Sequence, residues 1–194
     1  MNSAVLRPPI CKGPVGLGAK RTRVFIFFCK DSSLSVFRPD ALHKYFIFAK
    51  RIVIIHFQHI PEFLDKEEIS SLLEEFVLSY GFSIDTLHYN FVSQEKMLEI
   101  NKNYLKHNTH TDIISFDYSS GQSLKAEFFV SMWAVALSAE DESQTIENET
   151  LRVLIHGVLH CMGYKDDTKD KKTIMRQLED KFIHLFHVKQ KKHV

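Results

Sequence analysis

The apolar and polar residues within 51–194 follow two different periodic patterns. Segments rich in β-branched and aromatic residues, bounded by turn residues, are typical of strands. Segments with apolar residues three and four positions apart are typical of helices with one buried face. The first pattern predicts strands at 52–57, 85–92, 113–116 and 127–131. The second predicts helices within 65–80, 93–104, 132–139, 149–162 and 167–186.

Short polar residues mark the expected helix starts. Such side chains accept hydrogen bonds from the exposed N–H groups of a first helical turn. Asp65 or Ser70 is expected to begin the first helix. Asn148, at the end of an acidic linker over 140–149, is expected to begin the fourth. Trp133 lies in the predicted helix 132–139 and is expected to pack in the core.

The succession strand, helix, strand, helix, strand, strand, helix, helix predicts an α+β fold with a mixed sheet of about four strands. Helices are expected to pack on this sheet, with the helix 149–162 buried at one side. The chain has 194 residues, of which 44% are hydrophobic and 25% are charged. This composition suits one globular domain, which we assign to residues 49–194.

Residues 1–48 differ from the rest of the chain. They contain closely spaced prolines and glycines, eight Lys or Arg residues and two acidic residues. We predict an N-terminal extension that lies outside the domain and is poorly ordered. The protein is expected to be cytoplasmic. Basic, acid-poor N-terminal stretches are also typical of organellar transit peptides, so import into an organelle is the less favoured alternative.

The charge and cysteine content limit the function classes. Residues 49–194 contain 17 basic and 22 acidic residues, so the whole surface is not suited to capture nucleic acid, and any RNA contact must come from a local patch. No apolar run approaches the roughly 18 residues that cross a bilayer, and we expect no membrane association. Three cysteines without metal-type spacing favour a reducing compartment over a disulfide framework.

The strongest chemical signal is the segment 155–167, I-H-G-V-L-H-C-M-G-Y-K-D-D. His156 and His160 are four residues apart in an apolar run, so a helix places both imidazoles on one face. Gly163 is expected to end this helix and to reverse the chain, because glycine readily adopts the left-handed conformation. The acidic pair that follows can then return to the two histidines.

A catalytic zinc site commonly has three protein ligands and a fourth position open to water. Here the two imidazoles would supply two of the ligands, and Asp166 or Asp167 would supply the third. The alternative is a pair of hydrogen-bonded core histidines, which the turn and the acidic pair disfavour. Zinc peptidases use H-E-x-x-H, in which the glutamate is the general base. Gly157 occupies that position here, which counts against a peptidase.

The segment 156–164, H-G-V-L-H-C-M-G-Y, resembles the signature H-G-x-L-H-L-x-G-Y-D-H of the YbeY family. The resemblance implies an rRNA maturation factor with single-strand endoribonuclease activity, in which three histidines hold zinc. Lys165 and Asp166 stand in place of the final Asp-His. Asp166 is therefore the expected third ligand and Asp167 the runner-up, since a carboxylate binds zinc at a distance similar to that of imidazole.

A second segment, N-K-N-Y-L-K-H-N-T-H-T-D-I-I-S-F over residues 101–116, resembles the family pattern N-x-x-Y-R-x-x-x-x-x-T-D-V-L-S-F. The resemblance implies the edge of a substrate cleft. We predict that four of its residues bind substrate: Asn101, Tyr104, Thr111 and Ser115. The alternative for this loop is local capping by side-chain to backbone hydrogen bonds.

Two residues of the same segment are predicted to assist catalysis, namely Asp112 and Lys106. The family arginine after the tyrosine is Leu105 here. Lys106 follows it and can supply positive charge, though as a point charge rather than the two-pronged donor of an arginine.

The resemblance covers about residues 51–187 and implies a metal-dependent endoribonuclease of rRNA maturation and ribosome quality control. Its cofactor would be one Zn²⁺ per chain, held by His156, His160 and Asp166. Its partners would be rRNA and the small ribosomal subunit. Two alternatives stand beside it: a zinc hydrolase of another class, such as a peptidase, and a ribosome-associated binding factor with a structural metal.

Overall fold

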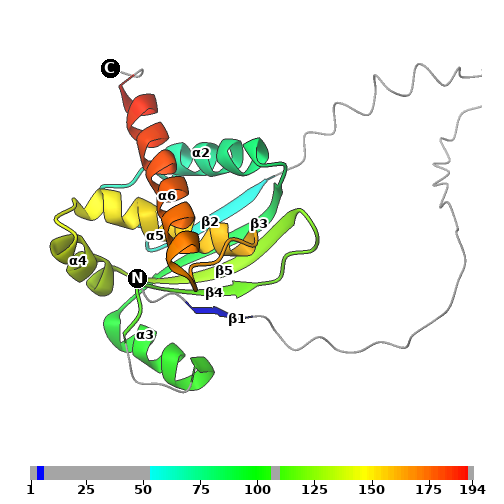
Figure 1. Ribbon diagram of the computed structural model, residues 1–194. Coiled ribbons are helices and arrows are strands. Elements are labelled where there is room, and N and C mark those ends of the chain that lie inside the picture. The colour runs from blue at the N-terminus through cyan, green and yellow to red at the C-terminus, as the bar shows by residue number, and fades with distance from the viewer. Residues whose placement is uncertain (1–3, 7–52, 106–109, 192–194) are drawn as a thin grey trace, which may run out of the picture. The chain divides into compact units, whose positions relative to one another are not determined.

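The computed structural model describes residues 4–6, 53–105 and 110–191 (Figure 1). The predicted catalytic residue Lys106 lies outside these residues. So does most of the predicted N-terminal extension, and its separation from the domain stays a prediction. Its described part is the short strand β1 (Ala4–Leu6).

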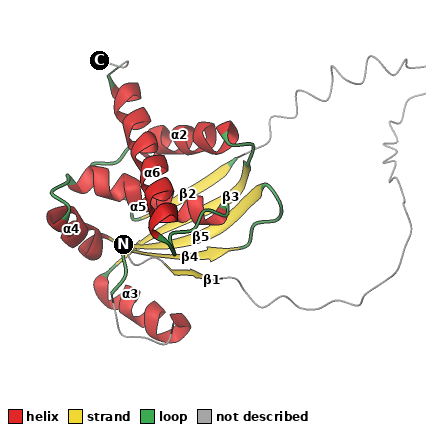
Figure 2. Ribbon diagram, in the orientation of Figure 1, coloured by secondary structure: helices red, strands yellow, loops and turns green. Residues whose placement is uncertain are grey.

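The strands form one mixed sheet in the order β1-β4-β5-β3-β2 (Figure 2). Neighbouring strands are parallel except for β4 and β5, which form an antiparallel hairpin. The α+β class and the four strands predicted within 51–194 are confirmed, and β1 adds a strand beside β4. The four strands are β2 (Ile54–Gln58), β3 (Ser83–Val92), β4 (Ile113–Asp117) and β5 (Ser123–Ser131).

Strands β3 and β5 begin earlier than the sequence pattern predicts. Ser83 pairs with Ser123 in the parallel ladder between them, so the pairing continues beyond the apolar runs. Residues 123–126 carry a weak strand pattern of their own. Tertiary pairing rather than local propensity therefore sets where these two strands begin.

Among the described residues, the helices agree with the prediction in order but differ at several ends. Asp65, not Ser70, caps the first helix, because its Oδ1 accepts a hydrogen bond from the N–H of Glu68 at 2.8 Å. The prediction of Asn148 as a cap is wrong: Thr145 Oγ1 accepts from the N–H of Asn148 at 3.2 Å. The helices are α2 (Lys66–Ser79), α3 (Gln94–Ile100), which a π-helical turn (Asn101–Leu105) follows, α4 (Met132–Asp141), α5 (Ile146–Cys161) and α6 (Lys169–Gln190).

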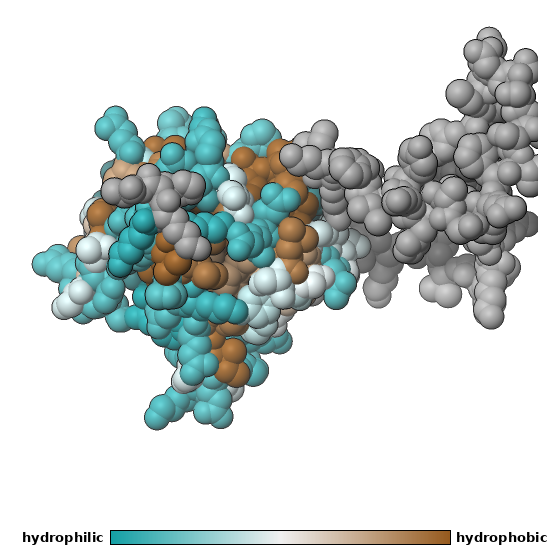
Figure 3. Space-filling model, turned by 90° about the horizontal axis from the view of Figure 1, so that it is seen from above, coloured by the Kyte–Doolittle hydropathy of each residue, from teal (hydrophilic) through white to brown (hydrophobic). Residues whose placement is uncertain are grey.

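The two faces of the sheet pack against different helices. Side chains alternate across the strand, so Ile113 of β4 joins the larger core and its neighbour Ile114 joins a smaller one. The larger core lies between the sheet and α2, α5 and α6, which share one side in Figure 1. Met97 and Ile100 of α3 form the smaller core with Ile114. Seen from the side of α2 and α6, hydrophobic residues reach the surface only in patches among hydrophilic ones (Figure 3).

Trp133 is not a core residue, which corrects the prediction. Its side chain is 41% exposed and packs against the ring of His110, with 4.7 Å between centroids. Helix α4 buries Ala134, Val135 and Ala139 instead. Trp133 lies two residues before Val135, about 200° around a helix, and therefore faces outward.

Helix α5 lies directly on the sheet, and its contacts explain the glycine between the histidines. The hydroxyl of the fully buried Tyr89 donates to the carbonyl oxygen of Leu154 at 3.2 Å. A Cβ atom at Gly157 would lie 2.8 Å from Cε1 of Phe128 and 2.9 Å from Cδ1 of Ile113. A larger residue at position 157 would therefore push α5 off the sheet. None of the described helices is long and apolar enough to cross a membrane.

We predict that Gly157→Ala lowers the free energy of unfolding by about 1–3 kcal/mol, the usual cost of overpacking a core. At an exposed helical site the same change raises the free energy of unfolding by up to about 1 kcal/mol. The sign of the change in unfolding free energy therefore tells whether position 157 is closely packed. Urea unfolding of the full chain measures it. Unchanged or increased stability would show that α5 does not need this close approach.

Candidate metal centre

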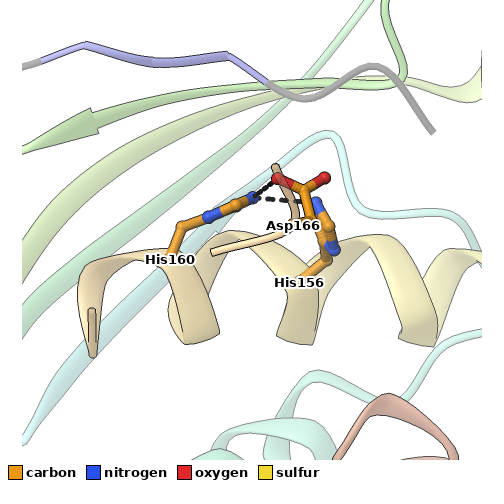
Figure 4. Close-up of side chains that lie close together, drawn as sticks. All are labelled: His156, His160 and Asp166. Carbon is orange, nitrogen blue, oxygen red and sulfur yellow. Dashed lines mark hydrogen bonds and ion pairs between the residues drawn. The ribbon is translucent and has the colours of Figure 1, made fainter. Parts of the chain in front are cut away.

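Helix α5 places His156 and His160 on the same side, one turn apart, as the sequence predicts (Figure 4). Their side chains are 3% and 9% exposed, and their Nε2 atoms are 3.0 Å apart. Gly163 has a φ of +95°, so the chain reverses there as predicted. The reversal brings Asp166 back to the histidines.

Asp166 is the carboxylate that meets the histidine pair. Its Oδ1 is 3.8 Å from Nε2 of His160, and one ligand atom from each of the three residues lies within 4.8 Å of the others. Asp167 is instead bonded to Lys171, with 2.7 Å from Oδ1 to Nζ. Within the described part of the chain, His156, His160 and Asp166 are the group of metal-ligating side chains that suits one ion.

Hydrogen bonds to the outer ring nitrogens orient both imidazoles. Nδ1 of His156 is 2.6 Å from Oε1 of Glu179, and Nδ1 of His160 is 3.0 Å from the carbonyl oxygen of Tyr164. A carbonyl oxygen only accepts, so Nδ1 of His160 carries a proton. Burial, and then the charge of His156, lower the pKa of His160, which favours the neutral ring. Nε2 is then the atom that each ring directs at its neighbour.

The two Nε2 atoms face each other at 3.0 Å, which is hydrogen-bonding distance. Imidazole nitrogens and a carboxylate oxygen are the donors that zinc takes in catalytic sites. The second hydrogen bond on each imidazole is the usual support of a metal-ligating histidine. The residues present therefore fit a metal ion.

A buried group of charges supports Glu179 from α5 and α6. Arg152 lies 3.3 Å from carboxylate oxygens of both Glu179 and Glu149, and 2.7 Å from Oδ1 of Asp180. Burial opposes the charged guanidinium, but the hydrogen bond and charge of Asp180 and the charge of Glu179 outweigh it and raise the pKa of Arg152. Arg152 thus remains charged and holds Glu179 against His156.

Asp112 directly precedes β4, and its carboxyl group is close enough to His156 for their charges to interact. Its side chain is 4% exposed, and its Oδ1 accepts from the N–H of Ile113 at 2.8 Å. Its Oδ2 is buried and has no hydrogen-bond partner among the described residues. Burial raises the pKa of Asp112, and the charge of His156 opposes this. Asp112 is therefore a further carboxyl group near His156, with an oxygen that no described residue bonds, and its catalytic role stays a prediction.

The four predicted substrate-binding residues fall into two groups. Asn101 and Thr111 are buried and bonded to each other, with 3.1 Å from Nδ2 to Oγ1, which ties the π-helical turn to the start of β4. Ser115 is fully buried. Tyr104 is 60% exposed and packs edge-on against Phe116. Substrate contact stays a prediction for all four. Asn101 and Thr111 already bond each other, whereas Oγ of Ser115 has no hydrogen-bond partner among the described residues.

Comparison with known proteins identifies the family. A model of the family described as endoribonuclease YbeY matches residues 56–187. The chain belongs to the YbeY family. Endoribonuclease YbeY of Flavobacterium psychrophilum is 40% identical to it over 139 residues, which is 71% of this chain and 99% of the relative. Endoribonuclease YbeY of Bacteroides thetaiotaomicron is 36% identical over 120 residues, 62% of this chain and 88% of the relative.

The fold is also that of a solved structure. The solution structure of TM1509 from Thermotoga maritima superposes with a TM-score of 0.54 at 22% identity, covering 73% of this YbeY chain and 93% of TM1509. At this identity the likeness concerns the fold. The matched region of the family model begins within β2 and ends within α6, so it contains the complete histidine and aspartate group.

Sequence reasoning missed the contribution of α6 to this YbeY site. Glu179 stands in the apolar stripe of that helix, between Met175 and Phe182. A carboxylate in an apolar stripe needs a buried partner, and this was the available signal. The partner lies 23 residues earlier, on another helix, so the sequence alone did not reveal it.

We predict that Glu179→Gln weakens zinc binding by about 10–100-fold, as loss of a supporting hydrogen-bond acceptor does at other metal sites. The amide can still bond Nδ1 but no longer carries the charge that polarises the imidazole. Zinc titration against a competing chelator measures the affinity. Asp180→Asn is the matched control, because it removes a carboxylate charge that pairs with Arg152 and makes no change at His156. Equal effects of the two variants would contradict a specific role for Glu179.

Proposed function

We propose that this YbeY protein is a zinc-dependent endoribonuclease that cuts single-stranded RNA in rRNA maturation. The observation that carries the proposal is the convergence of two imidazole nitrogens and one carboxylate in a chain that belongs to an endoribonuclease family. His156, His160 and Asp166 hold the ion. The small ribosomal subunit and its rRNA are the proposed partners, ribosome quality control is the proposed cellular context, and the cytoplasm is the proposed location.

The bound ion would supply Lewis-acid polarisation of a phosphate and a more acidic water molecule. The chain's own groups prepare the site. Glu179 and the carbonyl of Tyr164 hold the Nδ1 protons of the histidines, which keeps both rings in one orientation. Asp112 is the proposed proton acceptor, because burial raises its pKa and its Oδ2 has no hydrogen-bond partner among the described residues.

The peptidase alternative fails on geometry as well as on sequence. In H-E-x-x-H proteins the residue after the first histidine carries the general base. Position 157 faces Phe128 and Ile113 in the sheet, where a Cβ atom alone would lie within 3 Å of other atoms. A carboxylate at this position would be buried in the core rather than beside the metal.

We predict that the zinc-loaded chain cleaves a single-stranded oligoribonucleotide and leaves the matching duplex intact. Asp166→Ala removes a ligand and should lower the cleavage rate by more than about 100-fold, beyond the usual effect of losing a supporting residue. Asp166→His replaces the carboxylate with another zinc ligand and should retain activity. Asp167→Ala is the matched control and should cleave like the wild type.

Zinc content and RNA binding, measured on the same variants, separate the alternatives. A wild-type chain that binds zinc and RNA but never cuts RNA would instead support the binding factor with a structural metal. Cleavage that survives both Asp166→Ala and removal of zinc would contradict the proposed site.

A further inference from the structure

A cavity of about 500 Å³ adjoins the metal group, and α6 forms much of its wall. Ligand sites commonly span roughly 300–1,000 Å³, so this space is large enough for a nucleotide unit. His156 and Asp166 line the cavity together with three cations of α6: Lys169, Lys172 and Arg176. His156, Asp166 and the three cations therefore face one continuous space.

The spacing of the three cations explains why they share the cavity. Lys172 follows Lys169 by three residues and Arg176 follows Lys172 by four, which places all three on one face of α6. Lys171 lies outside this face. It lines a different hollow, beside Gly163 and Tyr164, and its Nζ is bonded to Asp167 at 2.7 Å.

The acidic groups of the same wall already have partners. Arg176 is 2.6 Å from Glu142 and 3.7 Å from Glu179. Asp180 is bonded to Arg152, and Glu179 is bonded to both Arg152 and His156. Three of the four acidic side chains that line the cavity are thus paired with an arginine, and the fourth, Asp166, belongs to the metal group.

Lys169 and Lys172 are exposed and have no ion pair with any described residue. Two ammonium groups without acidic partners, on the same wall as a metal site, suit an anion that reaches the metal. Each ammonium group offers three N–H donors to phosphate oxygens. In an extended nucleic-acid strand, each such cation can bind a separate backbone phosphate.

We propose that Lys169 and Lys172 form a phosphate-binding subsite that holds the RNA backbone next to the metal-bound scissile phosphate. Arg176 borders this subsite and, through its contacts with Glu142 and Glu179, fixes the wall behind it. The inference rests on the proposed function for its substrate, single-stranded RNA. It supplies the local basic patch that a domain with more acidic than basic residues needs to hold RNA.

Fluorescence anisotropy of the zinc-loaded full-length protein tests the subsite. The probe is a single-stranded 2′-O-methyl oligoribonucleotide, verified to remain uncut. The Lys169→Gln, Lys172→Gln double variant should bind about 10-fold more weakly. Each phosphate contact on a single strand contributes about 0.7 to the slope of log Kd against log salt concentration. The double variant loses two such contacts, so its slope should be lower than that of the wild type by about 1.4. Lys171→Gln is the matched control and should bind like the wild type, and the Lys169→Arg, Lys172→Arg double variant should retain most of the affinity.

Zinc content and cleavage kinetics complete the test. The double glutamine variant should keep its zinc, raise KM about 10-fold and change kcat little, because it loses substrate binding rather than chemistry. Wild-type affinity in this variant, or an equal loss in Lys171→Gln, would overturn the subsite even if the wild type cuts RNA. A wild type that never cuts RNA but depends on both lysines to bind it would overturn the proposed chemistry and uphold the subsite.

Discussion

The hydrogen bond between His156 and Glu179 connects the fold to the chemistry. It spans 2.6 Å between α5 and α6, and both side chains are almost fully buried. It orients the first imidazole of the candidate metal centre, and Arg152 stabilises the carboxylate of Glu179. A buried carboxylate without such partners costs several kcal/mol, so α6 can pack on α5 only when this group is complete. The packing of the C-terminal helix and the geometry of the site therefore depend on the same contact.

Close packing of α5 on the sheet sets which chemistry the helix can support. Gly157 lets α5 approach Phe128 and Ile113 closely. The position used by the general base of zinc peptidases is consequently filled by the sheet. What is open beside the histidines is the cavity that α6 lines with cations. The architecture thus favours a phosphate substrate over a peptide.

Local patterns in the sequence were sufficient for the motif helix, the reversal at Gly163 and most of the sheet, because each depends on neighbouring residues. They were also sufficient to bring Asp166 to the histidines. They failed where a contact joins distant segments. Glu179 is paired with a histidine on another helix, and the start of β5 is set by pairing with β3. Trp133 was misplaced because hydrophobicity alone does not tell which face of a short helix is buried.

The central claim is that His156, His160 and Asp166 hold one metal ion. A crystal structure of the zinc-loaded chain with anomalous scattering at the zinc absorption edge tests it most directly. One anomalous peak is expected about 2.0–2.2 Å from Nε2 of His156, Nε2 of His160 and a carboxylate oxygen of Asp166. An anomalous peak beside Asp167 instead of Asp166, or one that lies away from α5, would contradict this assignment of the ligands.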